Sequence, residues 1–275
     1  MNMMRFTTMK TKLRKYPSIF LILLLAISSC FLTGCVNQHP KDSKKSSQGE
    51  SVETMLEITD PKEKQAVLNA KAKVKALSGN PRIVATSPAV ADICDKLDLD
   101  LVGVPKSSVS KIPSRYKKVK KVGLAMSPDM EIVSSLNPDW ILAPSSLETD
   151  LKPKFEELKN TEYAFLNLRS VQGMYRSVQE LGEIFGKQQE AEKMTKEFTT
   201  FYKSYTKRNK NKKHPKVLVL MGLPGSYVIA TENSYVGSLV KLAGGENVYQ
   251  NTDQEFLTVN TEDMKKKEPD IIVRA

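Results

Sequence analysis

The chain has 275 residues, a formal net charge of +11 and 40% hydrophobic residues, which is enough for one large domain or two lobes. Five of its positive charges, and no negative charge, precede an apolar run at residues 19–31. The other basic residues include lysine clusters at 117–121 and 207–213, which are typical of solvated faces or loops. They are not interleaved with aromatic residues, so we expect no nucleic-acid partner.

The first 35 residues have the pattern of an export signal. Basic residues precede the run at 19–31, which is too short for a membrane span of roughly 20 residues. Residues 32–35 (Leu-Thr-Gly-Cys) resemble the lipobox of bacterial lipoproteins, whose Cys carries lipid such as palmitate. We expect a signal peptide at 1–34 and lipidation of Cys35. The chain is then held on the extracytoplasmic face of the cell membrane. An ordinary signal peptide, or an anchor helix with an incidental Cys, is the alternative.

Cysteine usage allows no disulfide within the processed chain. Cys30 lies in the signal and Cys35 is the expected lipid site, so Cys94 alone remains. Its apolar neighbours predict a small hydrophobic residue on a buried helix face.

The polar segment 35–80 is predicted as a tether that becomes helix-like over 51–78. Residues 81–169 then alternate strands and helices, which favours a parallel sheet covered by helices. Strands are expected at 82–85, 101–104, 140–143 and 164–168. Helices are expected after Ser87-Pro88 and after Ser127-Pro128, where a capping hydroxyl precedes a proline at the first helical position.

Residues 170–214 are predicted as connecting helices. Apolar residues keep a spacing of three and four from Val171 to Tyr205, with an interruption at Gly186. The helix over 187–208 spans roughly 33 Å at about 1.5 Å per residue.

Residues 215–275 restart the alternation, with strands at 216–220, 227–230 and 270–273 and helices at 238–243 and from 261. Asp-Met at 129–130 and Pro-Asp at 138–139 recur at 263–264 and 269–270, a weak internal repeat. The fold class is therefore α/β, with two Rossmann-like lobes joined by a long helix. The second lobe has fewer strands and stops at a strand, so we expect a truncated lobe and a fragment of a longer protein.

Longer sequence matches place the chain near one class of proteins. It resembles the helix-linked substrate-binding proteins of ATP-driven importers, and within them the haem-binding lipoproteins of the Gram-positive iron-regulated surface determinant system. The resemblance covers roughly residues 80–275. Matching stretches are 82–86 (RIVAT), 95–103 (DKLDLDLVG), 126–132 (MSPDMEI), 166–168 (LNL), 170–174 (SVQGM), 220–227 (LMGLPGSY), 230–232 (ATE), 239–242 (LVKL) and 244–248 (GGENV).

The resemblance implies that haem lies between the lobes, its iron held by a Met from one lobe and a His from the other. The matching Met is Met126, whose soft thioether suits haem iron. A helix starting at Ser127 is expected to fix its position. The family's His would lie just beyond Ala275 and is absent, and neither His39 nor His214 is expected to replace it.

The resemblance also implies sites for the haem propionates and for the importer. The helix opening at Ser87, Pro88 and Ala89 offers free N–H groups to a carboxylate, and a second loop contributes Lys106, Ser107 and Ser108. Ser108 and Val109 stand where the family has Tyr and Lys. Acidic residues dock this class on permease arginines, and Glu131 and Glu262 take that place. Both are equally well explained as first-turn residues favoured by a helix dipole.

The resemblance thus implies a monomer that takes haem from upstream surface proteins and hands it to a permease and its ATPase. A receptor for ferric siderophores or cobalamin is the alternative, and an inert truncated remnant is another. An enzyme has little support. Ser226 lies in no nucleophile elbow, residues 222–226 lack the lysine of a phosphate loop, and no metal-ligand cluster is evident.

Overall fold

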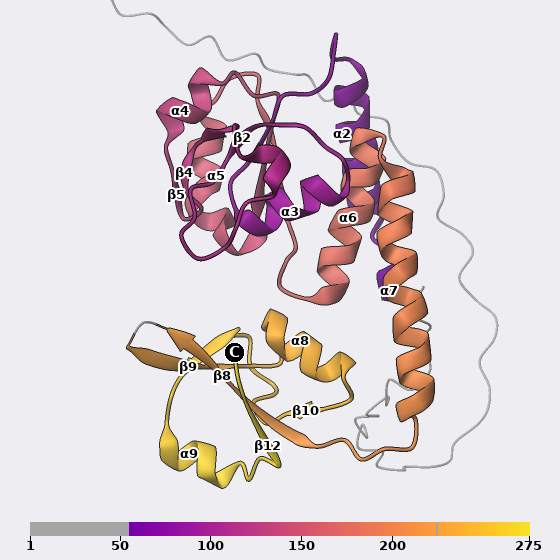
Figure 1. The fold of residues 1–275 in the computed structure, drawn as a ribbon, viewed down its shortest axis with the longest axis vertical. Coiled ribbons are helices and arrows are strands. Elements are labelled where there is room, and N and C mark those ends of the chain that lie inside the picture. Colours follow the sequence, from indigo (N-terminus) through magenta and orange to yellow (C-terminus); the bar gives the residue numbers. More distant parts are fainter. Residues whose placement is uncertain (1–54, 224) are drawn as a thin grey trace, which may run out of the picture. The chain divides into compact units, whose positions relative to one another are not determined.

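A computed structural model describes residues 55–223 and 225–275 (Figure 1). The predicted signal peptide, Cys35 and His39 lie outside these residues, so the structure does not bear on them. Within the described ranges, no helix is both long enough and apolar enough to cross a membrane.

The first sheet is parallel, with strand order β3-β2-β1-β6-β7. Its central strand β1 is buried along its whole length, because helices cover both faces. This confirms the parallel sheet expected from the alternation of apolar strands and helices. The strands are β1 (Ile83–Ala85), β2 (Leu101–Val104), β3 (Lys120–Lys121), β6 (Trp140–Pro144) and β7 (Glu162–Leu166).

Neighbouring residues of β1 enter two different hydrophobic cores. Ile83 belongs to the core under helix α3 (Pro88–Lys96), together with Cys94. Val84 faces the opposite core, where Phe155 of helix α5 (Glu148–Glu156) is buried. The lobe also holds helix α4 (Met130–Ser135), the hairpin strands β4 (Gly123–Leu124) and β5 (Ser127–Pro128), and the short 3-10 helices η1 (Ser114–Tyr116) and η2 (Ser145–Leu147).

Helix α2 (Pro61–Lys75) precedes the first sheet and packs against α6 (Val171–Phe185). Asp60 caps it and a proline takes its first position. Its sequence predicted helix but no packing partner, because its only buried residue is Val67.

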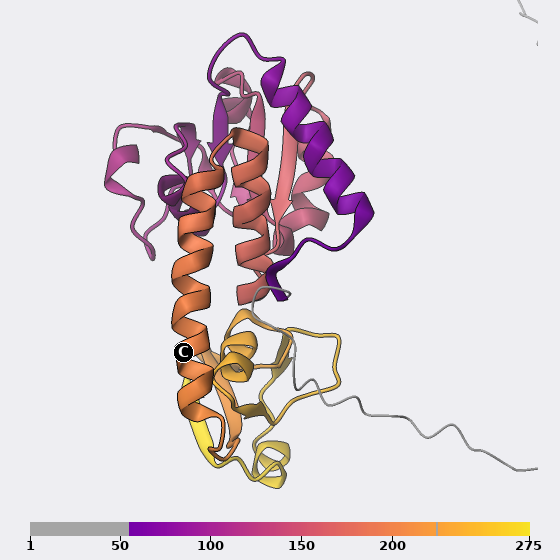
Figure 2. The ribbon, with the colours of Figure 1, turned by 90° about the vertical axis from the view of Figure 1, so that its right-hand side faces the viewer.

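The connecting helices α6 and α7 (Gln188–Asn209) run side by side (Figures 1 and 2). Gly186 ends α6 with φ +71°, in the left-handed region that glycine adopts without a steric penalty. The helices approach closely after this turn, since a Cβ on Gly182 would lie 2.6 Å from the Cβ of Ala191. The predicted break and the long second helix are both confirmed.

The second sheet has the order β10-β8-β9-β11, with β12 on the other edge of β8. It is mixed: β10 and β12 run parallel to β8, whereas β9 and β11 are antiparallel to their neighbours. Only two residues separate β8 from β9, and a connection this short permits a hairpin but no parallel crossover. The elements are β8 (Lys216–Leu223), β9 (Ser226–Ala230), α8 (Tyr235–Leu242), β10 (Glu246–Asn247), β11 (Phe256–Thr258), α9 (Thr261–Lys266) and β12 (Ile271–Arg274).

The two Pro-Asp junctions occupy equivalent places in the two sheets. Asp139 Oδ2 accepts a hydrogen bond of 2.7 Å from the backbone N–H of Arg82, just before β1. Asp270 Oδ2 accepts one of 2.8 Å from the N–H of Lys216, where β8 begins. Each Asp N–H also donates to the carbonyl of the same partner. The internal repeat in the sequence therefore corresponds to the same pair of hydrogen bonds in both sheets.

Candidate functional site

The predicted site residues of the first lobe lie in loops at the carboxyl ends of parallel strands. β1 leads into Ser87, and β2 leads into residues 105–113, which we call the β2 loop. From β1 the chain continues to β2 on one side of the sheet, and from β6 it continues to β7 on the other. The edge between β1 and β6 is thus a topological switch point, where open α/β sheets bind their ligands.

Ser87, Pro88 and Ala89 form the N-terminus of α3. Ser87 is the N-cap, and its Oγ accepts a hydrogen bond of 3.2 Å from the N–H of Val90. The cap therefore uses the hydroxyl of Ser87, which is buried. Ala89 is exposed, and first-turn N–H groups have no partner within a helix. Any carboxylate bound here would be held by the backbone and by the helix dipole.

The β2 loop is tied to itself and to its neighbour. Ser107 Oγ accepts a hydrogen bond of 3.0 Å from the N–H of Ser110, so this hydroxyl closes a local turn. The N–H of Lys106 donates to the carbonyl of Gly123 at 2.6 Å, which attaches the loop to the β4–β5 hairpin. Ser108 is exposed. The side chain of Val109 is 95% exposed.

Met126 lies in the turn of the β4–β5 hairpin, not at a helix start. β4 and β5 pair antiparallel, with Leu124 opposite Ser127, so residues 125 and 126 form the turn. The helix predicted to begin at Ser127-Pro128 begins instead at Met130, and its N-cap is Asp129. The expectation of a Ser127 cap was wrong because the Asp129 carboxylate accepts from two helix N–H groups while Ser127 is held in the strand pair.

Two backbone features fix this hairpin. Gly123 has φ +96°, and a Cβ there would lie 2.9 Å from the backbone nitrogen of Asp129. The N–H of Asp129 donates to the carbonyl of Val122 at 2.7 Å. The turn is thus anchored at its base, while Met126 is 73% exposed.

Three exposed apolar side chains belong to these two adjoining loops: Val109, Leu124 and Met126. The hydrogen bond between Lys106 and Gly123 joins the loops that carry them. Exposed apolar side chains on neighbouring loops indicate a binding surface more often than single ones do. We call these three residues the apolar loop group.

Glu131 and Glu262 both lie in the first turn of a short helix, in α4 and in α9. Both are exposed. The neighbouring caps, Asp129 and Asn260, bond the helix N–H groups, so neither glutamate side chain is needed for capping. Their role in docking stays a prediction.

Nucleophile and metal chemistry have little basis in the described residues. Cys94 is a fully buried free cysteine, as predicted, and burial raises the pKa of its thiol to about 12. His214 lies at the exit of α7, where its Nδ1 is 2.7 Å from the carbonyl oxygen of Gly244. The described residues contain no group of three or more His, Cys, Asp or Glu side chains suited to a metal ion.

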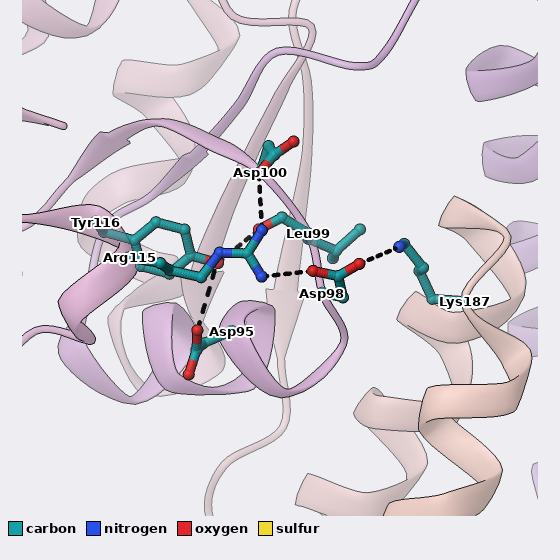
Figure 3. Close-up of polar contacts among 7 residues, drawn as sticks. All are labelled: Asp95, Asp98, Leu99, Asp100, Arg115, Tyr116 and Lys187. Atoms are coloured by element: carbon teal, nitrogen blue, oxygen red, sulfur yellow. Dashed lines mark hydrogen bonds and ion pairs between the residues drawn. The ribbon is translucent and has the colours of Figure 1, made fainter. Parts of the chain in front are cut away.

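An ion-pair network holds the far end of the β2 loop (Figure 3). Arg115 of η1 donates to Asp98 at 2.7 Å and to Asp100 at 2.8 Å. Lys187, between α6 and α7, donates to the second oxygen of Asp98 at 3.1 Å. The hydrogen bonds from Arg115 and Lys187 lower the pKa of Asp98. The network links η1, which directly follows the β2 loop, to Lys187 between the connecting helices.

A mostly apolar cavity of about 410 Å³ reaches the predicted site through Ala89. It lies among α3, α6 and α7, and Tyr235 of α8 also lines it. Its other lining residues are Asp92, Ile93, Lys96, Leu168, Met174 and Met194. Met126 does not line it, so this cavity and the apolar loop group are separate features.

Sequence reasoning missed Leu124 and Arg115. Leu124 belongs to the uncharged stretch 122–128, which signals a half-buried turn, but a two-residue strand leaves no periodicity to show which side chains are exposed. The close spacing of Asp95, Asp98 and Asp100 signals a basic partner. It does not say which of many basic residues supplies it.

Comparison with known proteins agrees with this architecture. Residues 83–275 match the family described as "Periplasmic binding protein". The high-affinity heme uptake system protein IsdE of Staphylococcus aureus (strain Newman) is 41% identical over 198 residues. The match covers 72% of this chain and 67% of that protein.

Two solved structures match with a TM-score of 0.65 each. One is an ABC transporter substrate-binding protein from Listeria monocytogenes EGD-e, 46% identical, with 71% of this chain and 75% of that chain covered. The other is S. aureus IsdE complexed with heme, 41% identical, with 71% and 76% covered. The α/β lobes and the connecting helices agree with these similarities, and the chain belongs to the periplasmic binding protein family.

Proposed function

We propose that this chain is a haem-binding lipoprotein that delivers haem to an ATP-driven importer for iron acquisition. The observation that carries the proposal is the apolar loop group, with the exposed thioether of Met126 on an anchored turn. The 41% identity to a heme uptake protein supports haem as the transported ligand.

Haem chemistry fits the residues of this surface. A porphyrin presents a large apolar face, which the side chains of Val109 and Leu124 can cover, and an iron that accepts a soft thioether. Its propionates need N–H donors or cations. The N-terminus of α3 supplies the first and Lys106, exposed on the β2 loop, supplies the second.

In this proposal Met126 is an axial ligand of the haem iron. Ser87, Pro88 and Ala89 contribute the α3 N-terminus to a propionate. Ser107 and Ser108 contribute the loop backbone, since the Ser107 hydroxyl already accepts a bond within its own turn. Because a thioether is neutral and soft, it stabilises the reduced iron more than a second nitrogen ligand would.

The proposal includes the chain's location and partners. Lipid on Cys35 would hold the protein at the extracytoplasmic face of the membrane, within reach of a permease and its ATPase. Glu131 and Glu262 would meet basic residues of the permease, one from each lobe. Haem would come from surface proteins further out, and the protein would act as a monomer that carries out no catalysis.

A haemin titration tests this function against the nearest alternative. The ligand-free protein is titrated with haemin, with a ferric hydroxamate siderophore and with cobalamin, and binding is followed by absorption and calorimetry. We expect a saturable Soret shift with one haem per chain and no saturable binding of the other two ligands. No Soret shift, together with tight binding of siderophore or cobalamin, would assign the chain to that other ligand. Haem recovered after extraction should be intact, and a degraded tetrapyrrole would contradict the proposal.

Haemin dimethyl ester tests the carboxylate site on α3. Esterified propionates have lost the negative charge that the helix dipole favours, so we expect weaker binding than with haemin, by about threefold to thirtyfold. Lys106→Ala should weaken haemin binding and leave ester binding unchanged, whereas Lys111→Ala is the matched control in the same loop. Equal affinity for haemin and its ester would remove the α3 N-terminus from the proposed site.

A further inference from the structure

A second feature, away from the proposed haem site, is the stretch that joins α7 to β8. Residues 207–216 contain six basic and no acidic residues: Lys207, Arg208, Lys210, Lys212, Lys213 and Lys216. All six are exposed, and in the described part of the chain no ion pair involves any of them. We call these residues the basic segment.

The backbone of the basic segment is fixed at its end. His214 bonds the carbonyl of Gly244, and the N–H of Glu246 donates to the carbonyl of Pro215 at 2.8 Å. Lys216 then starts β8, where its N–H bonds the Asp270 carboxylate. These contacts bring two acidic residues, Glu246 and Asp270, to the segment. Two negative charges against the six basic residues leave the segment with a net positive charge.

The other lysine cluster, at 117–121, differs in its surroundings. Arg115 immediately before it is paired with Asp98 and Asp100, and Asp95 lies 3.9 Å from the same guanidinium. These three carboxylates, paired with Arg115 and Lys187, lower the net positive charge next to that cluster. Among the residues that the structure describes, the contacts of the basic segment include no comparable group of acidic side chains.

We propose that the basic segment docks on the phosphate headgroups of an anionic lipid membrane. The inference rests on the proposed location of the chain at a membrane face. Clustered lysines and arginines are attracted to anionic bilayers, and the attraction acts within a Debye length of roughly 8 Å. Direct approach of the segment to the headgroups is therefore required.

An anchor at Cys35 would bring the segment within range of the membrane. Nineteen residues lie between Cys35 and Met55, and the twenty Cα–Cα steps from one to the other span at most roughly 70 Å when fully extended. Tethering makes the contact intramolecular, so an attraction too weak to recruit a free protein still orients an anchored one.

Lysine footprinting of the haem-free lipidated protein tests the proposal. The chain is reconstituted in vesicles of phosphatidylcholine alone or mixed with phosphatidylglycerol, and acylation of each lysine is followed by mass spectrometry. We expect phosphatidylglycerol to slow acylation of Lys207, Lys210, Lys212 and Lys213 by about threefold or more. In 1 M salt, where the Debye length is about 3 Å, this protection should disappear. Lysines 117–121 provide the internal control and should react equally in both vesicles.

A triple variant, Lys210→Gln with Lys212→Gln and Lys213→Gln, separates the segment from the rest of the chain. In it, Lys207 should lose the protection given by phosphatidylglycerol. Equal protection of both lysine clusters, or none at either, would overturn the proposal. Protection by inorganic phosphate without vesicles would indicate an ion site in place of membrane docking. Because haem is absent throughout, a failed haemin titration and a failed footprint remain distinct results.

Discussion

At the scale of single residues, Met126 is an apolar side chain whose exposure is explained by a proposed role in binding and not by packing. Large apolar side chains usually lie in the core, yet this one is exposed at the tip of a turn that backbone bonds hold in place. Its identity as a candidate ligand came from a sequence resemblance. Its conformation could not be predicted, because a hairpin with two residues per strand has no hydrophobic period.

Removal of Arg115 should weaken the attachment of η1, which directly follows the β2 loop. Arg115→Ala deletes the bonds to Asp98 and Asp100 and leaves those carboxylates close together. We expect the melting temperature to fall by about 2–4 °C at pH 7. Lys118→Ala, an exposed neighbour, should change it little. A variant as stable as the wild type in scanning calorimetry would mean that the network is only a surface contact.

The same variant has a defined pH dependence. Arg115 and Lys187 lower the pKa of Asp98, so the folded state binds this proton less tightly than the unfolded state. The stability that results is present above the ordinary pKa of 3.8 and is lost as the pH falls through the lowered value. The difference in melting temperature between wild type and Arg115→Ala should therefore shrink on acidification. A difference that grows at low pH would contradict this assignment.

At the scale of elements, two carboxylates of α6 that face α2 have pKa values shifted in opposite directions. Burial, then the hydrogen bond and charge of Glu63 on α2, raise the pKa of Glu180 to about 8, and Arg176 opposes the shift. Glu183, one turn further along α6, is paired with Lys71 of α2, and that bond lowers its pKa. One contact thus favours a protonated acid and the other an ionised one.

Glu180→Gln and Glu183→Gln should therefore change stability in opposite directions. The raised pKa of Glu180 gives stability below pH 4.5 that is lost as the pH rises through about 8. Glu180→Gln should unfold at a higher temperature than wild type above pH 8 and at the same temperature near pH 4. Glu183→Gln should be less stable at neutral pH. Thermal unfolding of both variants from pH 4 to 9 measures this, and parallel curves would contradict it.

The Pro-Asp junctions give a second prediction at this scale. Asp139→Ala and Asp270→Ala each remove an acceptor from the N–H that precedes or starts a central strand. Each should lower the free energy of unfolding by about 1–2 kcal/mol in urea titrations, whereas Asp253→Ala, in an exposed loop, should have little effect. Destabilisation in one lobe only would argue that the two junctions are not equivalent.

Helices and strands could be predicted where the spacing of apolar residues was regular. The seam from Val171 to Tyr205 predicted two helices and their break at Gly186. The antiparallel β8–β9 pair was missed because an apolar run does not reveal strand direction. Helix α2 was not placed because most of its residues are polar. Spacing alone does not identify the partner of a charged residue such as Lys71, which pairs with Glu183 of α6.

At the scale of the whole molecule, each lobe is built around a central strand and a returning strand. β6 pairs with β1 after α4, and β12 pairs with β8 after α9, with a Pro-Asp junction in each case. The sequence repeat indicated this construction. For the candidate site, chain order predicted that Ser87 and the β2 loop follow neighbouring strands. The bond from Lys106 to Gly123, which joins that loop to the hairpin, could not be predicted.

The central claim is that Met126 binds haem iron, and its replacement by Ala tests it most directly. In a haemin titration, Met126→Ala should shift the Soret and visible bands to those of a changed axial ligand. It should bind at least about tenfold more weakly, which corresponds to about 1.4 kcal/mol. Met130→Ala, four residues away and partly buried against the core, should keep the wild-type spectrum. An unchanged spectrum and affinity in Met126→Ala would contradict the account.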